Sequence, residues 1–355
     1  MHIAQIAPLA EAVPPKLYGG TERVVSWLTE TLVGLGHDVT LFASGDSTTS
    51  ARLVPCAQRG LRLDGIKDHL ASTLAMLAEV ERQAGRFDVI HFHVDMLHFP
   101  MFRHLADRCL TTLHGRQDVP DFWPAYRAFP EMKLVSISDS QRLPIADANF
   151  IATVHHGLPE GQIPPGSGEG GYLAFVGRIS PEKRPDRAIE IARAAGMKLR
   201  IAAKIDSADA AYFRDVIEPM LGGSGVEFVG EISDADKPAF LGDAAALLFP
   251  IDWPEPFGLV MIEAMAAGTP VVAWRNGSTA EVIEPGRSGW LVDSIEEAVA
   301  AVRAARDLPR AGVRACFEQR FTARHMARSY LDLYERLAAT AGAREPAPKP
   351  ISLVA

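Results

Sequence analysis

The segment 244–270 most tightly constrains how this chain can fold. It opens with a short apolar run, Ala244–Pro250, which has the length of a buried parallel strand and is stopped by a proline. It closes with Leu259–Ala267, which is rich in good helix formers and ends at a Gly-Thr-Pro sequence. Two prolines and Gly258 stand between the two parts, so no helix is expected before about residue 257. A strand, a turn and a helix in this order predict one unit of an α/β sheet.

Two carboxylates flank the start of this helix. Glu255 precedes it, and Glu263 lies about one turn inside it. Both are expected at the carboxyl edge of the sheet, where open α/β sheets bind ligands. The N–H groups of Phe257, Gly258 and Leu259 are predicted to be free donors for a phosphate or a sugar hydroxyl. The plain alternative is that both glutamates are solvated charges at a helix start, where the helix dipole favours them.

The first 157 residues alternate between short apolar runs and helical stretches. Helices are expected at about 21–35 and 68–84. This alternation predicts a parallel sheet with helices on its faces, so residues 1–157 are interpreted as one Rossmann-like domain. The expected strands are 2–7, 38–43, 88–92, 109–113, 133–137 and 151–155.

A second domain is predicted after a Gly- and Pro-rich linker at 158–171. Residues 172–321 repeat the α/β alternation, and 355 residues suffice for two hydrophobic cores, because single cores stop growing at roughly 250–300 residues. Residues 322–341 carry apolar side chains at helical spacing, and the tail 342–355, with three prolines, is predicted to be disordered. The expected strands of the second domain are 172–176, 198–203, 226–229, 245–249, 270–273 and 290–292.

Two further strand-to-helix turns carry residues suited to binding phosphate. Gly19 and Gly20 follow the first strand, where glycines let the backbone approach a ligand at the helix start. Arg178 and Lys183 follow the first strand of the second domain and offer a planar fork and a point charge for a diphosphate. The plain alternatives are an ordinary turn for the glycines and a solvated basic turn paired with Glu182 for the cations.

Taken in order along the chain, these pieces resemble the retaining glycosyltransferases of family four, which have the GT-B fold. Glu255 to Glu263 matches their E-x7-E signature, and the resemblance extends over nearly the whole chain. It implies two Rossmann-like, doubly wound parallel-sheet domains that face an interdomain cleft. The first domain would hold the acceptor and the second the nucleotide sugar, and the helix 322–341 would cross back to the first domain. The other matching pieces are Gly19-Gly20, Gly177-Arg178 with Lys183, and Gly268-Thr269-Pro270-Val271-Val272-Ala273.

The resemblance also implies an activity and roles for individual residues. It predicts transfer of a sugar from a nucleotide diphosphate sugar to an acceptor hydroxyl, without a metal or another cofactor. Arg178 and Lys183 would neutralise the leaving diphosphate, a role that such a leaving group requires when no metal is present. Glu263 would hold the ribose hydroxyls and Glu255 those of the transferred sugar. Gly20 would close over the diphosphate, and the stretch ending at Ile232 would contact the base through backbone groups.

The histidines and one acidic pair are candidate metal ligands. His91 and His93 point the same way on a strand, but no carboxylates with ligand spacing accompany them, so no metal is predicted. His114 ends a strand at the cleft, and the resemblance places it near the transferred sugar; its plain alternative is a hydrogen bond to a backbone carbonyl. Asp234-Ala235-Asp236 has the form of a D-x-D metal motif, but Ser233 or Asp234 as a helix cap explains it.

A serine-rich strand end resembles another piece of the family's cleft. The stretch Ser136-Ile137-Ser138-Asp139-Ser140 is also explained by a helix cap at Ser138 or Asp139. The loop Gly115–Phe129, with Trp123 and Tyr126, offers aromatic faces for a sugar acceptor, or forms a small core of its own.

Composition bounds the remaining classes of function. A net charge of -8 and a pI near 5.8 argue against nucleic acid as a partner, and membrane contact is expected only if the acceptor is a lipid. Three scattered cysteines and the absence of a signal peptide predict a cytoplasmic protein. Alternative functions are a GT-B nucleotide-sugar epimerase, a sugar phosphorylase or, with least support, a two-lobed sugar-binding protein. The acceptor, the donor sugar and the base are left open.

Overall fold

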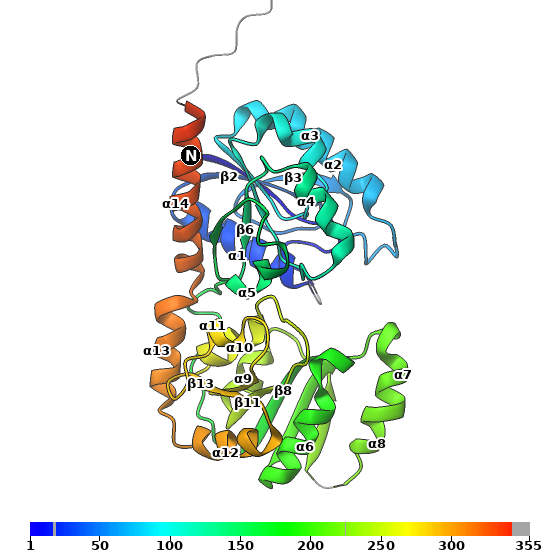
Figure 1. Ribbon diagram of the computed structural model, residues 1–355, viewed down its shortest axis with the longest axis vertical. Coiled ribbons are helices and arrows are strands. Elements are labelled where there is room, and N and C mark those ends of the chain that lie inside the picture. Colours follow the sequence, from blue (N-terminus) through cyan, green and yellow to red (C-terminus); the bar gives the residue numbers. More distant parts are fainter. Residues whose placement is uncertain (17–18, 224, 343–355) are drawn as a thin grey trace, which may run out of the picture.

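The computed structural model describes residues 1–16, 19–223 and 225–342, which form two α/β domains stacked end to end (Figure 1). Each domain has one parallel sheet, of seven strands in the first and six in the second. The two parallel sheets confirm the predicted GT-B architecture. Leu17 and Tyr18, next to the glycine pair, lie outside the described residues. Of the tail predicted at 342–355, Gly342 is the last residue of a helix, and the rest lies outside the described residues.

The first sheet has the strand order β3-β2-β1-β4-β5-β6-β7. Its strands are β1 (His2–Ile6), β2 (Asp38–Ser44), β3 (Arg52–Ala57), β4 (Val89–Phe92), β5 (Cys109–Thr112), β6 (Leu134–Ser136) and β7 (Phe150–Thr153). The helices of this domain are α1 (Gly20–Gly34), α2 (Leu70–Gln83), α3 (Phe99–Phe102), α4 (Trp123–Ala128) and α5 (Asp139–Arg142).

The second sheet has the order β10-β9-β8-β11-β12-β13. Its strands are β8 (Tyr172–Arg178), β9 (Lys198–Lys204), β10 (Val226–Gly230), β11 (Ala246–Phe249), β12 (Val271–Trp274) and β13 (Gly289–Val292). The helices that accompany it are α6 (Pro185–Ala195), α7 (Ala210–Tyr212), α8 (Glu218–Met220), α9 (Lys237–Gly242), α10 (Leu259–Ala266), α11 (Thr279–Val282), α12 (Ile295–Ala305) and α13 (Arg310–Arg320).

One strand, β3, was not predicted from the sequence. It contains Pro55, which has no N–H to give to a neighbouring strand, and it lies at the edge of the sheet, where a proline is tolerated. Its residues are exposed or half-buried and lack the continuous apolar character of the interior strands.

Two chain segments run side by side where the domains join. The N–H of Leu158 donates to the carbonyl of Phe321 at 3.0 Å, and the N–H of Ala323 donates to the carbonyl of Leu158 at 2.9 Å. Gly157 is tightly enclosed here, because a Cβ on it would lie 2.2 Å from the Thr322 carbonyl oxygen. The chain therefore leaves the first domain and returns to it through one narrow, hydrogen-bonded junction.

The returning segment is α14 (Ala323–Gly342), which runs along the first domain in Figure 1. Its apolar stripe packs on α1 and β4. Met326, Tyr330 and Leu333 are buried in the same core as Trp27 and Leu28 of α1. Burial of this stripe, rather than helix propensity, is what fixes α14 on the first domain.

Candidate active site in the interdomain cleft

Lys183 and Glu255 form an ion pair at the carboxyl edge of the second sheet. Lys183 ends a single turn after β8, and Glu255 lies in the loop after β11, the strand next to β8. The Trp253 indole N–H also donates to Glu255 Oε2 at 3.0 Å, and the Lys183 ammonium lies 4.8 Å from the Trp253 ring centroid. The carboxylate and the ammonium thus hold each other at the place that the sequence predicted for both.

The first turn of α10 presents its N–H groups beside this pair. Gly258 precedes the helix with φ 78°, and a Cβ there would lie 2.9 Å from Met261 Cε and 3.0 Å from Phe249 Cζ. Only glycine combines this left-handed backbone with so little space. Among the described residues, none accepts a hydrogen bond from the N–H of residues 257, 258 or 259. These amides are therefore available to an anionic ligand at a helix start.

Glu263 belongs to a second charged cluster, which reaches across the cleft. Its carboxylate accepts a hydrogen bond from Lys237 Nζ at 2.9 Å, and Lys237 lies 3.4 Å from Asp234. Arg23, from α1 of the first domain, pairs with the same Asp234. Burial alone would lower the pKa of Lys237, but the Glu263 carboxylate outweighs it and raises this pKa. Glu263 is buried, and its carboxylate is paired with the Lys237 ammonium.

Asp234 therefore forms ion pairs with Arg23 and Lys237 and does not cap a helix. Burial favours its neutral form, but Arg23 and Lys237 together lower the pKa of its carboxyl group. Of the two predicted caps, Ser233 is confirmed at the turn that leads into α9, and Asp234 is wrong. The residue before α9 is Asp236, whose side chain caps no amide, while Ser233 Oγ accepts the Asp236 N–H at 3.2 Å. At the other serine motif the prediction is confirmed, because Ser138 Oγ caps α5 through the Gln141 N–H at 3.0 Å.

Arg178, the last residue of β8, is surrounded by acidic side chains. It pairs with Glu182, and its guanidinium lies 3.3 Å from Asp209 and 4.0 Å from Asp206. The pairing with Glu182 that the sequence offered as the plain alternative is therefore present. A diphosphate at this edge would have to compete with three carboxylates for this cation.

His114 follows β5 and lies where the two domains meet. Its Nε2 is 2.8 Å from His93 Nδ1, and its ring stacks on His156 with centroids 5.3 Å apart. His156 in turn contacts Phe257 of the second domain, with centroids 4.9 Å apart. Burial lowers the pKa of His114 to about 3, so its ring is neutral at physiological pH. The expected partner, a backbone carbonyl, is replaced by another histidine.

The glycine pair lies at the opposite wall of the cleft. A Cβ on Gly19 would lie 2.8 Å from Pro15 Cβ, and one on Gly20 would lie 3.9 Å from Leu259 Cδ1. The start of α1 therefore faces the start of α10 across the cleft. Ile232, after β10, packs at the margin of the core that both domains share. The structure thus brings Gly20 and Arg23 of the first domain close to Leu259 and to the Glu263 cluster of the second. It places Glu255 and Lys183 beside Trp253, and His114 beside the His156–Phe257 contact.

The predicted acceptor loop is held mostly by its own contacts. Tyr126 is buried and its hydroxyl donates to Gln117 Oε1 at 2.7 Å, while the Trp123 indole donates to the Gln117 carbonyl at 3.0 Å. Phe122 is 41% exposed, whereas Trp123 and Phe129 are half-buried. Of the two alternatives from the sequence, the small core describes Tyr126.

Several residues of the cleft were not singled out from the sequence as site residues. Lys237 and Arg23 meet their partners only through the fold, since they stand 26 and 211 residues from Glu263 and Asp234, whereas Trp253 stands 2 residues from Glu255. The Trp253 indole carried a local signal, because it lies within the loop that holds Glu255. The long-range pairs carried none.

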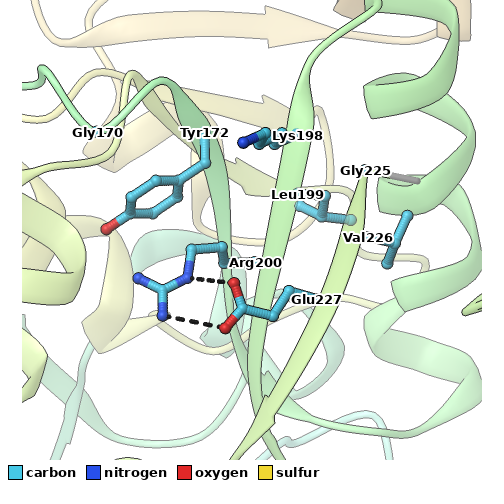
Figure 2. Close-up of a pocket in the computed structure, with 8 residues that line it drawn as sticks. All are labelled: Gly170, Tyr172, Lys198, Leu199, Arg200, Gly225, Val226 and Glu227. Carbon is cyan, nitrogen blue, oxygen red and sulfur yellow. Dashed lines mark hydrogen bonds and ion pairs between the residues drawn. The ribbon is translucent and has the colours of Figure 1, made fainter.

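A surface hollow of about 330 Å³ lies outside the cleft (Figure 2). It is lined by the first residues of β8, β9 and β10, so it opens at the amino edge of the second sheet, opposite the ligand-binding edge. Its Arg200 is already paired with Glu227 at 2.9 Å and lies over the Tyr172 ring. This hollow has no part in the site described above.

Comparison with known proteins shows the family of this chain. Residues 164–311 match the family described as Glycosyl transferases group 1, and residues 19–160 match the Glycosyl transferase 4-like domain.

None of the helices in the described ranges is long and apolar enough to cross a bilayer.

Three similar proteins illustrate the range of relatives. A D-inositol 3-phosphate glycosyltransferase of Mycolicibacterium smegmatis is 27% identical over 78% of this chain and 75% of its own. A glycogen synthase of Mycobacterium tuberculosis is 28% identical over 95% of both. The structure of Anabaena HepE in complex with UDP superimposes with a TM-score of 0.73 at 16% identity, over 94% of this chain and 100% of HepE, and HepE is also known in complex with UDP-glucose. With two family matches that together span the chain from residue 19 to 311, and with the GT-B fold, the protein belongs to the group 1 glycosyltransferases.

Proposed function

We propose that this glycosyltransferase is a retaining enzyme that moves a sugar from a nucleoside diphosphate sugar to an acceptor hydroxyl, and that it needs no metal ion. The observation that carries the proposal is the Lys183–Glu255 pair beside the open amides of α10. A cation and N–H donors suit a diphosphate, and a carboxylate suits sugar hydroxyls. The UDP and UDP-glucose complexes of HepE support a nucleotide sugar as donor.

In this proposal the diphosphate binds against Lys183 and the first turn of α10. Charge builds up on the diphosphate as the sugar leaves, and a fixed ammonium and helix start stabilise that charge without reorganising. Lys183 is bound to Glu255 before the donor arrives, so donor binding exchanges one anionic partner of this cation for another. Arg178 acts at longer range, because Glu182, Asp206 and Asp209 already surround it.

The two glutamates bind the two sugar units of the donor, the ribose and the transferred sugar. Glu263 accepts hydrogen bonds from the ribose hydroxyls, and the Lys237 ammonium, which donates to the same carboxylate, holds it in place. Glu255 accepts hydrogen bonds from hydroxyls of the transferred sugar, on the side of the cleft where Phe257 contacts His156, on which His114 stacks. Glu255 and Glu263 are eight residues apart, one in the turn before α10 and one inside α10. This spacing sets the distance between the bound ribose and the transferred sugar.

Transfer proceeds on one face of the sugar. The bond from the anomeric carbon to the diphosphate oxygen breaks, the bond to the acceptor oxygen forms, and a donor phosphate oxygen takes the acceptor proton. This account needs no protein nucleophile, and Glu255 is held by Lys183 and Trp253 rather than poised for attack. The acceptor enters from the first domain.

The experiment is incubation of the protein with a panel of nucleotide sugars, UDP-glucose first, with release of nucleoside diphosphate as the readout. We expect release that depends on an acceptor, persists in EDTA and yields a product with the donor's anomeric configuration by NMR. Loss of release in EDTA that Mg²⁺ or Mn²⁺ restores would contradict metal independence. Inversion of the anomeric centre would contradict retention.

A further inference from the structure

A chain of buried hydrogen bonds connects α14 to His114 through the first sheet. Gln5 of β1 occupies its centre, with Nε2 3.0 Å from the Tyr334 hydroxyl and Oε1 2.8 Å from His93 Nε2. His93 Nδ1 then meets His114 Nε2 at 2.8 Å. Gln5 and His93 are buried, so water does not replace these contacts.

The direction of each hydrogen bond follows from Gln5. Its amide N–H donates to Tyr334, so its carbonyl oxygen is left to accept the proton of His93 Nε2. Burial lowers the pKa of His93 well below its usual value, and a neutral imidazole carries one proton. His93 Nδ1 is therefore a lone pair, which must accept from His114 Nε2–H.

The other ring nitrogen of His114, Nδ1, is then a hydrogen-bond acceptor. With its proton on Nε2, Nδ1 carries a lone pair, and this buried atom has no hydrogen-bond partner among the described residues. The opposite tautomer would set two nitrogen lone pairs 2.8 Å apart and leave a buried N–H without an acceptor. His114 Nδ1 can therefore accept a hydrogen bond from a ligand that carries a donor, such as a hydroxyl group.

We propose that Gln5 and His93 are positioning residues, which hold His114 as its Nε2–H tautomer so that Nδ1 accepts a hydrogen bond from a hydroxyl group of the bound sugar. The ligand part of this inference rests on the proposed function. The tautomer part does not, because it concerns the protein without a ligand. His93 and Gln5 act only through His114.

The test is ¹⁵N–¹H NMR of the histidine rings in the protein without ligand, with His114 assigned from the resonances that His114→Gln removes. We expect an unprotonated Nδ1 and a protonated Nε2 on His114. In His93→Leu, which removes the acceptor, we expect this signature to be lost. In His93→Asn the amide oxygen lies near the former Nδ1 position, so the signature should persist.

Thr111→Val is the matched control. It removes an equally buried hydrogen bond, between the Thr111 hydroxyl and His98 Nε2 at 2.9 Å, in which neither Gln5 nor His93 takes part. The His114 signature should not change in this variant. Thermal melting of all variants identifies any that do not fold, in which case the wild-type tautomer and His93→Asn still decide the matter.

Kinetics and a donor titration test the ligand part. We expect His93→Leu to lower kcat about tenfold, the effect of one lost hydrogen bond, while affinity for free nucleoside diphosphate is kept. Addition of a turned-over nucleotide sugar should shift the His114 Nδ1 resonance, and free nucleoside diphosphate should not.

An Nδ1–H tautomer in the wild type, or an unchanged signature in His93→Leu, would overturn the role of Gln5 and His93. An unshifted Nδ1 resonance in a protein that turns over donor would overturn the sugar contact alone. Absence of turnover with every nucleotide sugar would overturn the proposed function and leave the tautomer standing.

Discussion

At the scale of single residues, Lys183 is the side chain whose role the structure makes most open to test. Its ammonium pairs with Glu255 and lies over Trp253, so it is held in place before any donor binds. Because its charge matters most as the diphosphate departs, Lys183→Ala should lower kcat by more than it weakens donor binding. Steady-state kinetics together with calorimetry of free nucleoside diphosphate measure the two effects separately. Lys198→Ala, which changes the exposed first residue of β9, is the control, and an unchanged kcat in Lys183→Ala would reject the role.

The two glutamates should respond differently to the same change. Glu263→Gln should weaken the affinity for donor and for free nucleoside diphosphate alike, because ribose is bound before the reaction. It also leaves Lys237 without its closest anionic partner. Glu255→Gln should bind nucleoside diphosphate nearly as well as the parent and turn over about 10²-fold more slowly, since it loses a strong transition-state hydrogen bond. Calorimetry decides. Loss of diphosphate affinity in Glu255→Gln, or its retention in Glu263→Gln, would show that the donor lies the other way round.

At the scale of elements, the turn into α10 depends on glycine. Gly258→Ala must place a Cβ against Met261 and Phe249 and keep a positive φ, so we expect a loss of about 1–3 kcal/mol in the free energy of unfolding. Gly312→Ala is the matched control, because Gly312 lies in α13 with open space around its Cβ position and should gain about 0.5 kcal/mol. Urea unfolding measures both. Equal stabilities of the two variants would contradict the strain at Gly258.

The elements themselves could largely be predicted from the sequence, for a physical reason. Interior parallel strands such as β8 and β11 are continuous apolar runs, and prolines and glycines mark where α10 begins, so local pattern and fold agree. The edge strand β3 was missed because Pro55 and half-buried residues give it no such pattern. The partners of the predicted site residues could not be foreseen. Lys237 reaches Glu263, and His93 reaches His114, only after distant segments pack together.

At the scale of the whole molecule, contacts between the domains decide how wide the cleft is. Glu281 of α11 accepts the N–H groups of Asp139 at 2.7 Å and Ser140 at 2.8 Å, and lies 3.2 Å from His155 Nε2, all in the first domain's segment. Burial alone would raise the pKa of Glu281, but the hydrogen bonds from His155 and from these two amides lower it. A carboxylate of one domain thus holds a helix start of the other.

The contact of the Glu281 carboxylate with the first domain predicts that the width of the cleft depends on pH. A pKa that is lower in the joined state stabilises that state at a pH above the ordinary glutamate range, and the contribution is lost as pH falls through the lowered value. The wild type should therefore open on acidification below about pH 4, the ordinary value for glutamate. Glu281→Gln should already be more open at neutral pH, because an amide is a weaker acceptor for these donors. Small-angle scattering should show that the radius of gyration of the wild type rises on acidification. The radius of gyration of Glu281→Gln should be larger at pH 7 and should depend less on pH.

Glu284→Gln, which alters a pair with Arg320 inside the second domain, should match the wild type. If Glu281→Gln scatters as the wild type does at every pH, the width of the cleft is set by other contacts, of which the Arg23–Asp234 pair is the next to remove.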